Sequence, residues 1–329
     1  MPGRITIDAP CKINLYLWVG ECRADGFHDI ESLFAALSLR DTLDFELVRG
    51  AGNAAGRDEV YVETTELPPP FDRALAALPP EKNLVYHAIK LFKRETGFDR
   101  AVRARVYKRI PAAAGLGGAS SDAAAALLAM KTLSGAEIFP QRLRDIAAEL
   151  GSDVPFFAGL TGEAFVRDPV FQYSAAFVRG RGELVEAAAA PPLNIVIVNP
   201  GIESGTKEAF DRLDAYRLRY RSGVDGSIPP QKTYSSKDLP AELAKSPSEW
   251  RFTNDFLPVF LETEPVNHVY TAVLRDIERC GALFCGLSGS GASCFGVFTD
   301  SHSAADAATR LAPLWPFVRA TASVVSGSA

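Results

Sequence analysis

One short stretch, residues 110–122, constrains this chain more than any other, because glycine and alanine lead there directly into a helix-forming segment. The stretch reads IPAAAGLGGASSD, and alanine and leucine dominate the next residues. Small residues let backbone N–H groups approach a ligand closely. The helix start adds unpaired N–H groups and the positive end of its dipole. The pattern predicts an anion site, usually for phosphate, formed by Pro111, Ala112, Ala113, Ala114, Gly115, Leu116, Gly117, Gly118, Ala119, Ser120 and Ser121.

Two better-known phosphate loops do not fit this stretch. A Walker loop needs Gly-x-x-x-x-Gly-Lys-Ser/Thr, and that pattern occurs nowhere in the chain. A dinucleotide fingerprint needs a third glycine where Ser120 stands. The alternative without a ligand is a tight turn in which Ser120 or Ser121 caps the helix. We favour the anion site, because so much glycine ahead of a good helix costs free energy unless its backbone freedom is used.

Composition excludes several classes of protein. The chain has 329 residues, enough for two domains of ordinary size, and a net charge of −5. Such an acidic chain lacks the basic footprint of a nucleic-acid or anionic-membrane binder, so we expect neither partner. No signal peptide or membrane-spanning run is evident. The five cysteines show no Cys-x-x-Cys spacing, which indicates reduced thiols, and we expect a soluble cytoplasmic protein.

Hydrophobic periodicity outlines the elements around the loop. Residues 101–109 alternate as a strand does, so the chain there reads strand, loop, helix. Further strands are predicted over 4–19 with a break at Pro10, and over 42–48 and 193–199. Paired strands are predicted over 164–181, and two strands joined by a small-residue turn over 283–298. Helices are predicted over 83–95, over 141–150 with Gly151 as a left-handed end, and over 206–213, 254–277 and 304–314.

Two segments carry little information about the fold. Residues 50–80 are rich in glycine, alanine and proline, which predicts an exposed hairpin or excursion. Residues 217–250 are polar with glycine, proline and serine, which predicts a long mobile connection.

Three motifs, taken in order, resemble those of the GHMP kinase superfamily. They are residues 10–15 (PCKINL), the loop 111–121, and residues 287–292 (LSGSGA). The resemblance implies an α+β protein with the two-domain GHMP kinase fold. Residues 1–162 would form a ribosomal-protein-S5-like domain that holds the loop. Residues 163–329 would form a ferredoxin-like domain, with the active site in the cleft between the two.

Three alanines set this loop apart from its relatives. Ala113, Ala114 and Ala119 stand where those proteins often carry glycine. A methyl group is tolerated at negative φ but is disfavoured at positive φ. These positions therefore decide whether the loop keeps the shape that the resemblance implies.

Further pieces resemble one branch of the superfamily, which phosphorylates the 2-hydroxyl of a cytidylated sugar alcohol in isoprenoid precursor synthesis. They are residues 23–28 (RADGFH), 150–157 (LGSDVPFF) and 199–201 (NPG). The resemblance implies ATP as phosphate donor and Mg²⁺, whose ligands the sequence leaves unknown. Whether the protein forms a homodimer stays open. Phe27 stands where tyrosine is commoner, which keeps stacking and loses a hydroxyl. The implied acceptor site contains Asn14, Phe27, His28, Thr206, Phe210, Gly289 and Ser290.

The resemblance also assigns catalysis to Lys12 and Asp153. Asp153 would accept the proton of the acceptor hydroxyl, and Lys12 would orient both groups. An adjacent ammonium keeps a carboxylate ionised even when it is partly buried. A helix cap ahead of Pro155 explains Asp153 without catalysis. Two functional alternatives stay open: a kinase of another small alcohol, such as homoserine or mevalonate, and a ligand-binding relative without turnover, which would be expected to lose the base.

Overall fold

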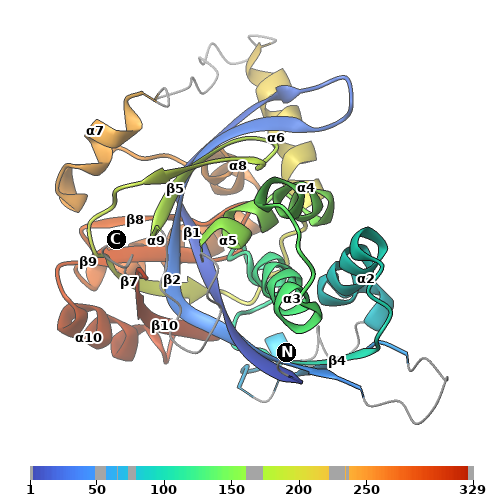
Figure 1. Ribbon diagram of the computed structural model, residues 1–329. Helices are drawn as coiled ribbons and strands as arrows, with labels where there is room; N and C mark the ends of the chain where they lie inside the picture. The colour runs from blue at the N-terminus through green and yellow to red at the C-terminus, as the bar shows by residue number, and fades with distance from the viewer. Residues whose placement is uncertain are drawn as a thin grey trace.

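The computed structural model describes residues 3–48, 57–64, 66–72, 79–160, 173–221, 234 and 237–324. In this part of the chain, the first of two β-sheets has six strands in the order β3-β4-β2-β5-β6, with β1 also paired to β2. These strands are β1 (Arg4–Cys22), β2 (His28–Leu47), β3 (Glu59–Glu63), β4 (Val102–Tyr107), β5 (Ala175–Gly180) and β6 (Leu184–Ala188). The long antiparallel strands β1 and β2 run through the middle of the molecule (Figure 1).

Helices cover one side of this sheet. Figure 1 shows them grouped beside β1 and β2, on the side away from the second sheet. Their small and aliphatic residues pack against the strands in a continuous hydrophobic core, and α3 is buried along most of its length. The helices are α2 (Leu84–Thr96), α3 (Gly118–Ser134), α4 (Pro140–Leu150) and α5 (Val154–Leu160), with a short 3₁₀ turn at Pro80–Lys82.

The second sheet has the order β10-β7-β9-β8, and all of its pairings are antiparallel. Its strands are β7 (Asn194–Asn199), β8 (Phe284–Leu287), β9 (Cys294–Phe298) and β10 (Phe317–Ala322). Numbered by position in the chain, this order is 4-1-3-2, with helices between the first and second and between the third and fourth strands. This is the β-α-β-β-α-β arrangement of a ferredoxin-like sheet. The helices of this half are α6 (Thr206–Arg221), α7 (Leu239–Leu243), α8 (Phe256–Glu262), α9 (Val266–Arg279) and α10 (Ser301–Leu311).

Strands β1 and β2 change faces at Pro10. Ala9 packs in the core with helices α2–α5, whereas Cys11 packs in the core between the two sheets. Side chains two apart on a regular strand share a face, so the alternation reverses at the register shift that follows Pro10. The expected break is therefore an irregularity within one continuous strand. It turns Lys12 toward the helices, where its Nζ lies 4.6 Å from the centre of the Phe34 ring.

Several predicted elements differ from those observed. The helix predicted over 254–277 is two helices, α8 and α9, with Pro265 before the second because proline lacks the N–H of a continuous helix. Gly151 ends α4 in extended rather than left-handed backbone. The strand predicted over 42–48 is the end of the much longer β2.

The two segments of low information contain structure where they are described. Residues 50–80 include β3 and the buried side chains of Leu67 and Phe71, so this part is not simply an exposed excursion. Residues 217–250 include the end of α6 and helix α7. Residues 49–56, 65, 73–78, 222–233 and 235–236 lie outside the description.

The domain boundary predicted after residue 162 falls outside the described residues, because the description omits 161–172. The same gap covers much of the strand pair predicted over 164–181. Beyond the gap, β5 pairs with both β2 and β6, so the first sheet includes residues that follow the boundary. The boundary stays a prediction.

Candidate active site

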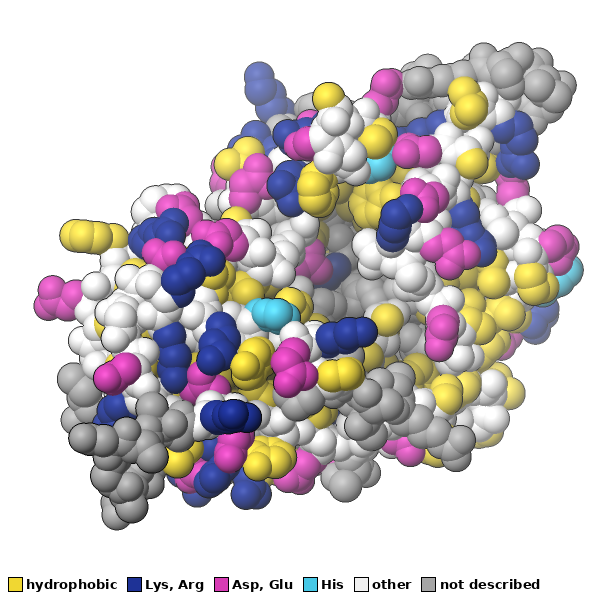
Figure 2. Space-filling view, turned by 90° about the vertical axis from the view of Figure 1, so that its right-hand side faces the viewer, with side chains coloured by type: hydrophobic (Ala, Val, Ile, Leu, Met, Phe, Trp, Pro, Cys, Tyr) yellow, Lys and Arg dark blue, Asp and Glu magenta, His cyan; other side chains and the backbone are white. Residues whose placement is uncertain are grey.

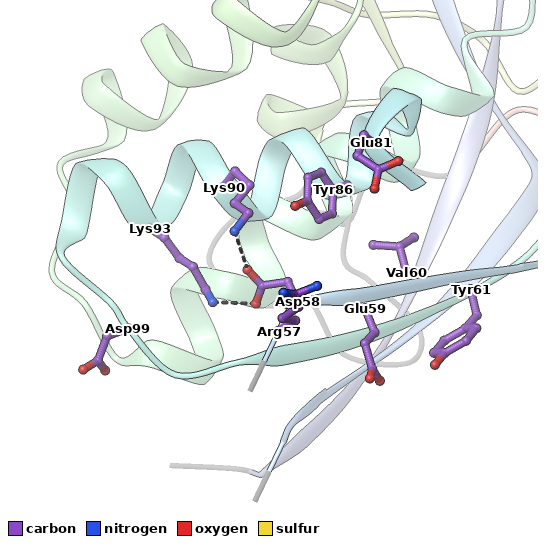
Figure 3. A pocket seen from close by; sticks show the side chains of 10 residues that line it. All are labelled: Arg57, Asp58, Glu59, Val60, Tyr61, Glu81, Tyr86, Lys90, Lys93 and Asp99. Carbon is purple, nitrogen blue, oxygen red and sulfur yellow. Dashed lines mark hydrogen bonds and ion pairs between the residues drawn. The ribbon is translucent and has the colours of Figure 1, made fainter. Parts of the chain in front are cut away.

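Two large hollows stand out in the described structure. One, of about 750 Å³, lies between β3 and α2. Its main cations are already engaged, since Asp58 pairs with both Lys90 and Lys93 (Figure 3). The other, of about 650 Å³, is lined by residues of all three motifs. Figure 2 shows a hollow in the middle of the face that is turned to the viewer. The second hollow is the candidate active site.

Nearly all of the predicted site residues line this cavity. Those that do are Lys12, Asn14, Phe27, His28, Pro111, Ala112, Ala113, Ala114, Gly115, Gly117, Gly118, Ala119, Ser120, Asp153, Thr206, Phe210, Gly289 and Ser290. Leu116 and Ser121 are buried outside the lining. Cavity lining places these residues together, and their individual roles stay predictions.

Hydrogen bonds to the backbone of the loop join the three motifs. The Lys12 N–H donates to the Leu116 carbonyl at 2.9 Å, and the Ser288 hydroxyl donates to the Gly115 carbonyl at 2.8 Å. The Ser293 N–H donates to the Ala114 carbonyl at 3.1 Å. The loop is therefore held from the first domain by β1 and from the second by the turn between β8 and β9.

The loop conformation depends on left-handed backbone at three positions. Gly115 has φ 74° and Gly117 has φ 69°. Ala113 also takes positive φ, at 49°, although a left-handed non-glycine residue costs roughly 1–2 kcal/mol. Gly117 is the N-cap of α3, so Ser120 and Ser121 lie inside the first turn and neither caps the helix.

A buried charge cluster supports the loop from beneath. The Asp41 carboxylate accepts from the N–H groups of Arg109 and Ile110, directly before the loop. Lys108 donates to Asp41 and, at 2.7 Å, to Asp122 in the first turns of α3. Burial raises the pKa of the Asp122 carboxyl, Lys108 opposes this shift, and the neighbouring Asp41 carboxylate adds to it, so that the pKa comes to about 7. The cluster thus ties the start of the loop to the start of the helix.

Lys12 and Asp153 form an ion pair at the cavity wall. Lys12 Nζ lies 3.4 Å from Asp153 Oδ2, with side-chain exposures of 4% and 25%. Lys12 also donates to Asn14 Oδ1 at 2.6 Å, and Asn14 donates to the Ser32 hydroxyl at 2.9 Å. Among the described residues, the Asp153 carboxylate makes no hydrogen bond to an N–H group of α5. A buried ammonium therefore faces a carboxylate that is open to a ligand, and the helix-cap interpretation gains no hydrogen bond.

Aromatic side chains gather at the end of the cavity where the acceptor site is predicted. The His28 ring lies 4.8 Å from the Phe210 ring at an interplanar angle of 35°. Phe27, from the same hairpin as His28, is nearly half exposed at 46%. The Arg181 guanidinium lies 3.6 Å from the centre of the Phe27 ring. One face of Phe27 is thus covered by a cation, and the cavity offers two further rings for a flat ligand.

Several lining residues were not identified from the sequence. They include Cys22, Ser152, Arg181, Lys207, Asp211 and Asp214. Phe210 and Asp214 are four residues apart on α6, a spacing that places side chains on one helix face. That spacing could have indicated Asp214, whereas Arg181 reaches the site through the pairing of β2 with β5.

Comparison with known proteins defines the class. Residues 83–159 match the family "GHMP kinases N terminal domain", and residues 246–314 match "GHMP kinases C terminal". Together with the two sheets, the glycine loop and the cleft between them, these matches show a GHMP kinase with the two-domain fold of that class.

Within that class, the chain belongs to the 4-diphosphocytidyl-2-C-methyl-D-erythritol kinase family. It is 34% identical to the enzyme of that name from Treponema pallidum over 94% of this chain and 96% of the relative. It is also 34% identical to the one from Anaeromyxobacter sp. strain K, over 93% and 84%. A crystal structure of 4-(cytidine 5'-diphospho)-2C-methyl-D-erythritol kinase superposes with a TM-score of 0.70 at 28% identity and covers 98% of this chain.

No helix in the described part of the chain is both long enough and apolar enough to cross a bilayer.

Proposed function

We propose that the protein transfers the γ-phosphate of ATP to the 2-hydroxyl of 4-diphosphocytidyl-2-C-methyl-D-erythritol, a step of non-mevalonate isoprenoid precursor synthesis. The observation that carries the proposal is the Lys12–Asp153 pair in a cavity that also contains the glycine loop and the aromatic cluster. A ligand-binding relative without turnover would have no use for a buried lysine held against an accessible carboxylate.

The chemistry follows from this geometry. As the acceptor oxygen attacks the γ-phosphorus, its proton passes to an oxygen of Asp153, and the bond from the γ-phosphorus to the bridging oxygen breaks to release ADP. Lys12, which pairs with Asp153, polarises the same hydroxyl. Asn14 fixes Lys12 through its own hydrogen bond to Ser32, so the ammonium is held in position before the substrate binds.

The loop would bind the phosphates of ATP through its backbone N–H groups and the start of α3. Mg²⁺ would be held chiefly by the phosphates, and the donor set suits it, because the Ser120 hydroxyl and the Asp153 carboxylate are oxygen donors on the same cavity wall. When bound, the ion would neutralise charge that develops on the β and γ phosphates.

The acceptor end favours a cytosine base. Phe27 and Phe210 offer two aromatic faces, and His28 offers a polar ring nitrogen at their edge. Arg181 and Lys207 line the same region, and their positive charge suits the diphosphate of the acceptor. The loss of the tyrosine hydroxyl at Phe27 leaves the stacking surface intact.

A substrate panel tests the proposal. The purified protein is given Mg²⁺-ATP with the cytidylated acceptor, homoserine or mevalonate, and ADP release is followed. We expect turnover of the cytidylated alcohol alone, with phosphate on its 2-hydroxyl. Comparable turnover of homoserine or mevalonate would assign a different acceptor, and nucleotide binding without turnover would leave a ligand-binding relative.

The remaining expectations concern the setting of the enzyme. We propose a cytoplasmic protein without nucleic-acid partners, in keeping with its net charge of −5 and its small soluble substrates. Cell fractionation tests the location, and sedimentation of the purified protein decides whether it forms a homodimer.

A further inference from the structure

We propose that Cys22, His28 and Asp214 form a binding site for a borderline-soft divalent cation, Zn²⁺ above all, and that the bound ion blocks the acceptor site. One ligand atom of each residue, a thiol sulfur, an imidazole nitrogen and a carboxylate oxygen, lies within 4.8 Å of the other two. All three residues line the active-site cavity. The binding site stands on geometry, and the blocking effect rests on the proposed function.

Two of the three ligands face each other across the β1–β2 hairpin, just after a register shift between Val19 and Cys22. Cys22, the last residue of β1, is paired in register with His28, the first residue of β2. Directly opposite residues of an antiparallel pair have Cβ atoms about 4.5–5.5 Å apart, so sulfur and imidazole start within reach of one ion. Asp214 approaches the same point from α6.

The histidine is already oriented for a ligand. Its ring lies tilted against Phe210, its side chain is only 6% exposed, and its Nε2 lies 3.0 Å from Asp214 Oδ1. Zinc bonds of about 2.0–2.3 Å in a tetrahedron bring ligand atoms roughly 3.3–3.8 Å apart. The cluster must contract by about an ångström, and the exposed Cys22 and the 40%-exposed Asp214 side chain have room to move.

The donor set selects against the magnesium that accompanies ATP. A thiolate and an imidazole favour zinc, whereas Mg²⁺ prefers oxygen ligands in octahedral geometry. On binding, the Cys22 thiol releases its proton to the buffer, and thiolate plus carboxylate then balance the two charges of the ion. Two nearby arginines are engaged elsewhere, since Arg23 pairs with Asp29 and Arg217 with Asp255.

The consequence for the enzyme follows from the position of His28. An ion held by the imidazole keeps His28 from turning a ring nitrogen to the polar edge of the acceptor base, and it occupies space beside Phe210. No residue of the phosphate loop is a ligand. Zinc should therefore compete with the acceptor and not with ATP.

Metal binding is tested first, with Co²⁺ as the probe and without any substrate. A cobalt–thiolate bond absorbs strongly in the near ultraviolet, so titration of the apoprotein should produce this band, and Zn²⁺ should abolish it. Cys22→Ser should remove the band, and Asp214→Asn should weaken binding by about tenfold or more. Cys280→Ser and Cys285→Ser, which change two other partly accessible thiols, are matched controls and should keep it. A band that survives Cys22→Ser, or no band in the unaltered protein, overturns the site.

Inhibition is tested second, under saturating Mg²⁺-ATP. Zn²⁺ should raise the KM for the acceptor with little effect on the KM for ATP. Half-inhibition of Cys22→Ser, relative to its own uninhibited rate, should need about tenfold more Zn²⁺ or above. Equal sensitivity of variant and parent overturns the blocking effect. If no acceptor is turned over at all, the proposed function fails while the cobalt result still decides the metal site.

Discussion

Replacing Asp153 by asparagine removes the proposed base while keeping nearly the same shape. Asparagine cannot take the acceptor proton at neutral pH, so proton transfer must go to solvent or remain incomplete in the transition state. General-base catalysis contributes about 10²–10⁴-fold, so we expect kcat to fall by about 100-fold or more. A factor of 100 corresponds to about 2.7 kcal/mol of activation free energy.

The same change has a smaller effect on stability, which the geometry of Lys12 allows us to bound. Coulomb's law gives about 5 kcal/mol for unit charges 3.4 Å apart at an effective dielectric constant of about 20. Solvent reaches the 25%-exposed carboxylate and screens much of this attraction. Lys12 also keeps its bond to Asn14 and its contact with Phe34. We therefore expect a loss of about 1–2 kcal/mol in the free energy of unfolding.

The assay separates these two effects. Urea unfolding gives the stability of Asp153→Asn, calorimetry gives its affinity for ATP, and ADP release gives kcat and KM. Asp145→Asn, at an exposed carboxylate on α4, is the matched control and should change none of them appreciably. A folded Asp153→Asn protein that binds ATP and keeps kcat within about threefold of the parent would refute the role of base.

Other substitutions test the loop, its support and the acceptor end. Gly115→Ala places a Cβ 2.0 Å from the Ser288 carbonyl oxygen, so it should lower the free energy of unfolding by about 3 kcal/mol or more. Gly97→Ala, at a similar φ but in open space, is the control and should lower it by about 1 kcal/mol. Equal losses for the two variants in urea unfolding would refute the clash. His28→Ala should raise the KM for the acceptor far more than that for ATP, and parallel rises in steady-state kinetics would contradict the assignment. The pKa of Asp122 is raised on folding, so the native state binds the extra proton and its stability falls as pH rises from about 4 to 7. Asp122→Asn should remove this slope of at most about 1.4 kcal/mol per pH unit, and an unchanged slope in urea titrations would contradict the cause.

Much of the site could be identified from the sequence because its motifs are local. A run of small residues before a helix needs no tertiary partner to indicate an anion site, and residues 111–121 were found on that ground. The resemblance then supplied Lys12, Asp153 and the aromatic residues, and the structure brings these to one cavity. The predicted helix bounds were less exact: the helix predicted over 254–277 is interrupted before Pro265, although a proline at that position could itself have indicated the break.

What only the tertiary structure decided depends on contacts between residues that are far apart in the chain. Asp41 and Lys108 carry no motif, and they support the loop only because the end of β4 lies beside β2. The face on which Lys12 lies follows from a register shift between β1 and β2, and no alternation within either strand predicts it. Cys22 and Asp214 meet because a hairpin and α6 converge on His28. Sequence therefore determined which chemical groups the protein has and their local order, whereas strand register and helix packing decided which of them share a site.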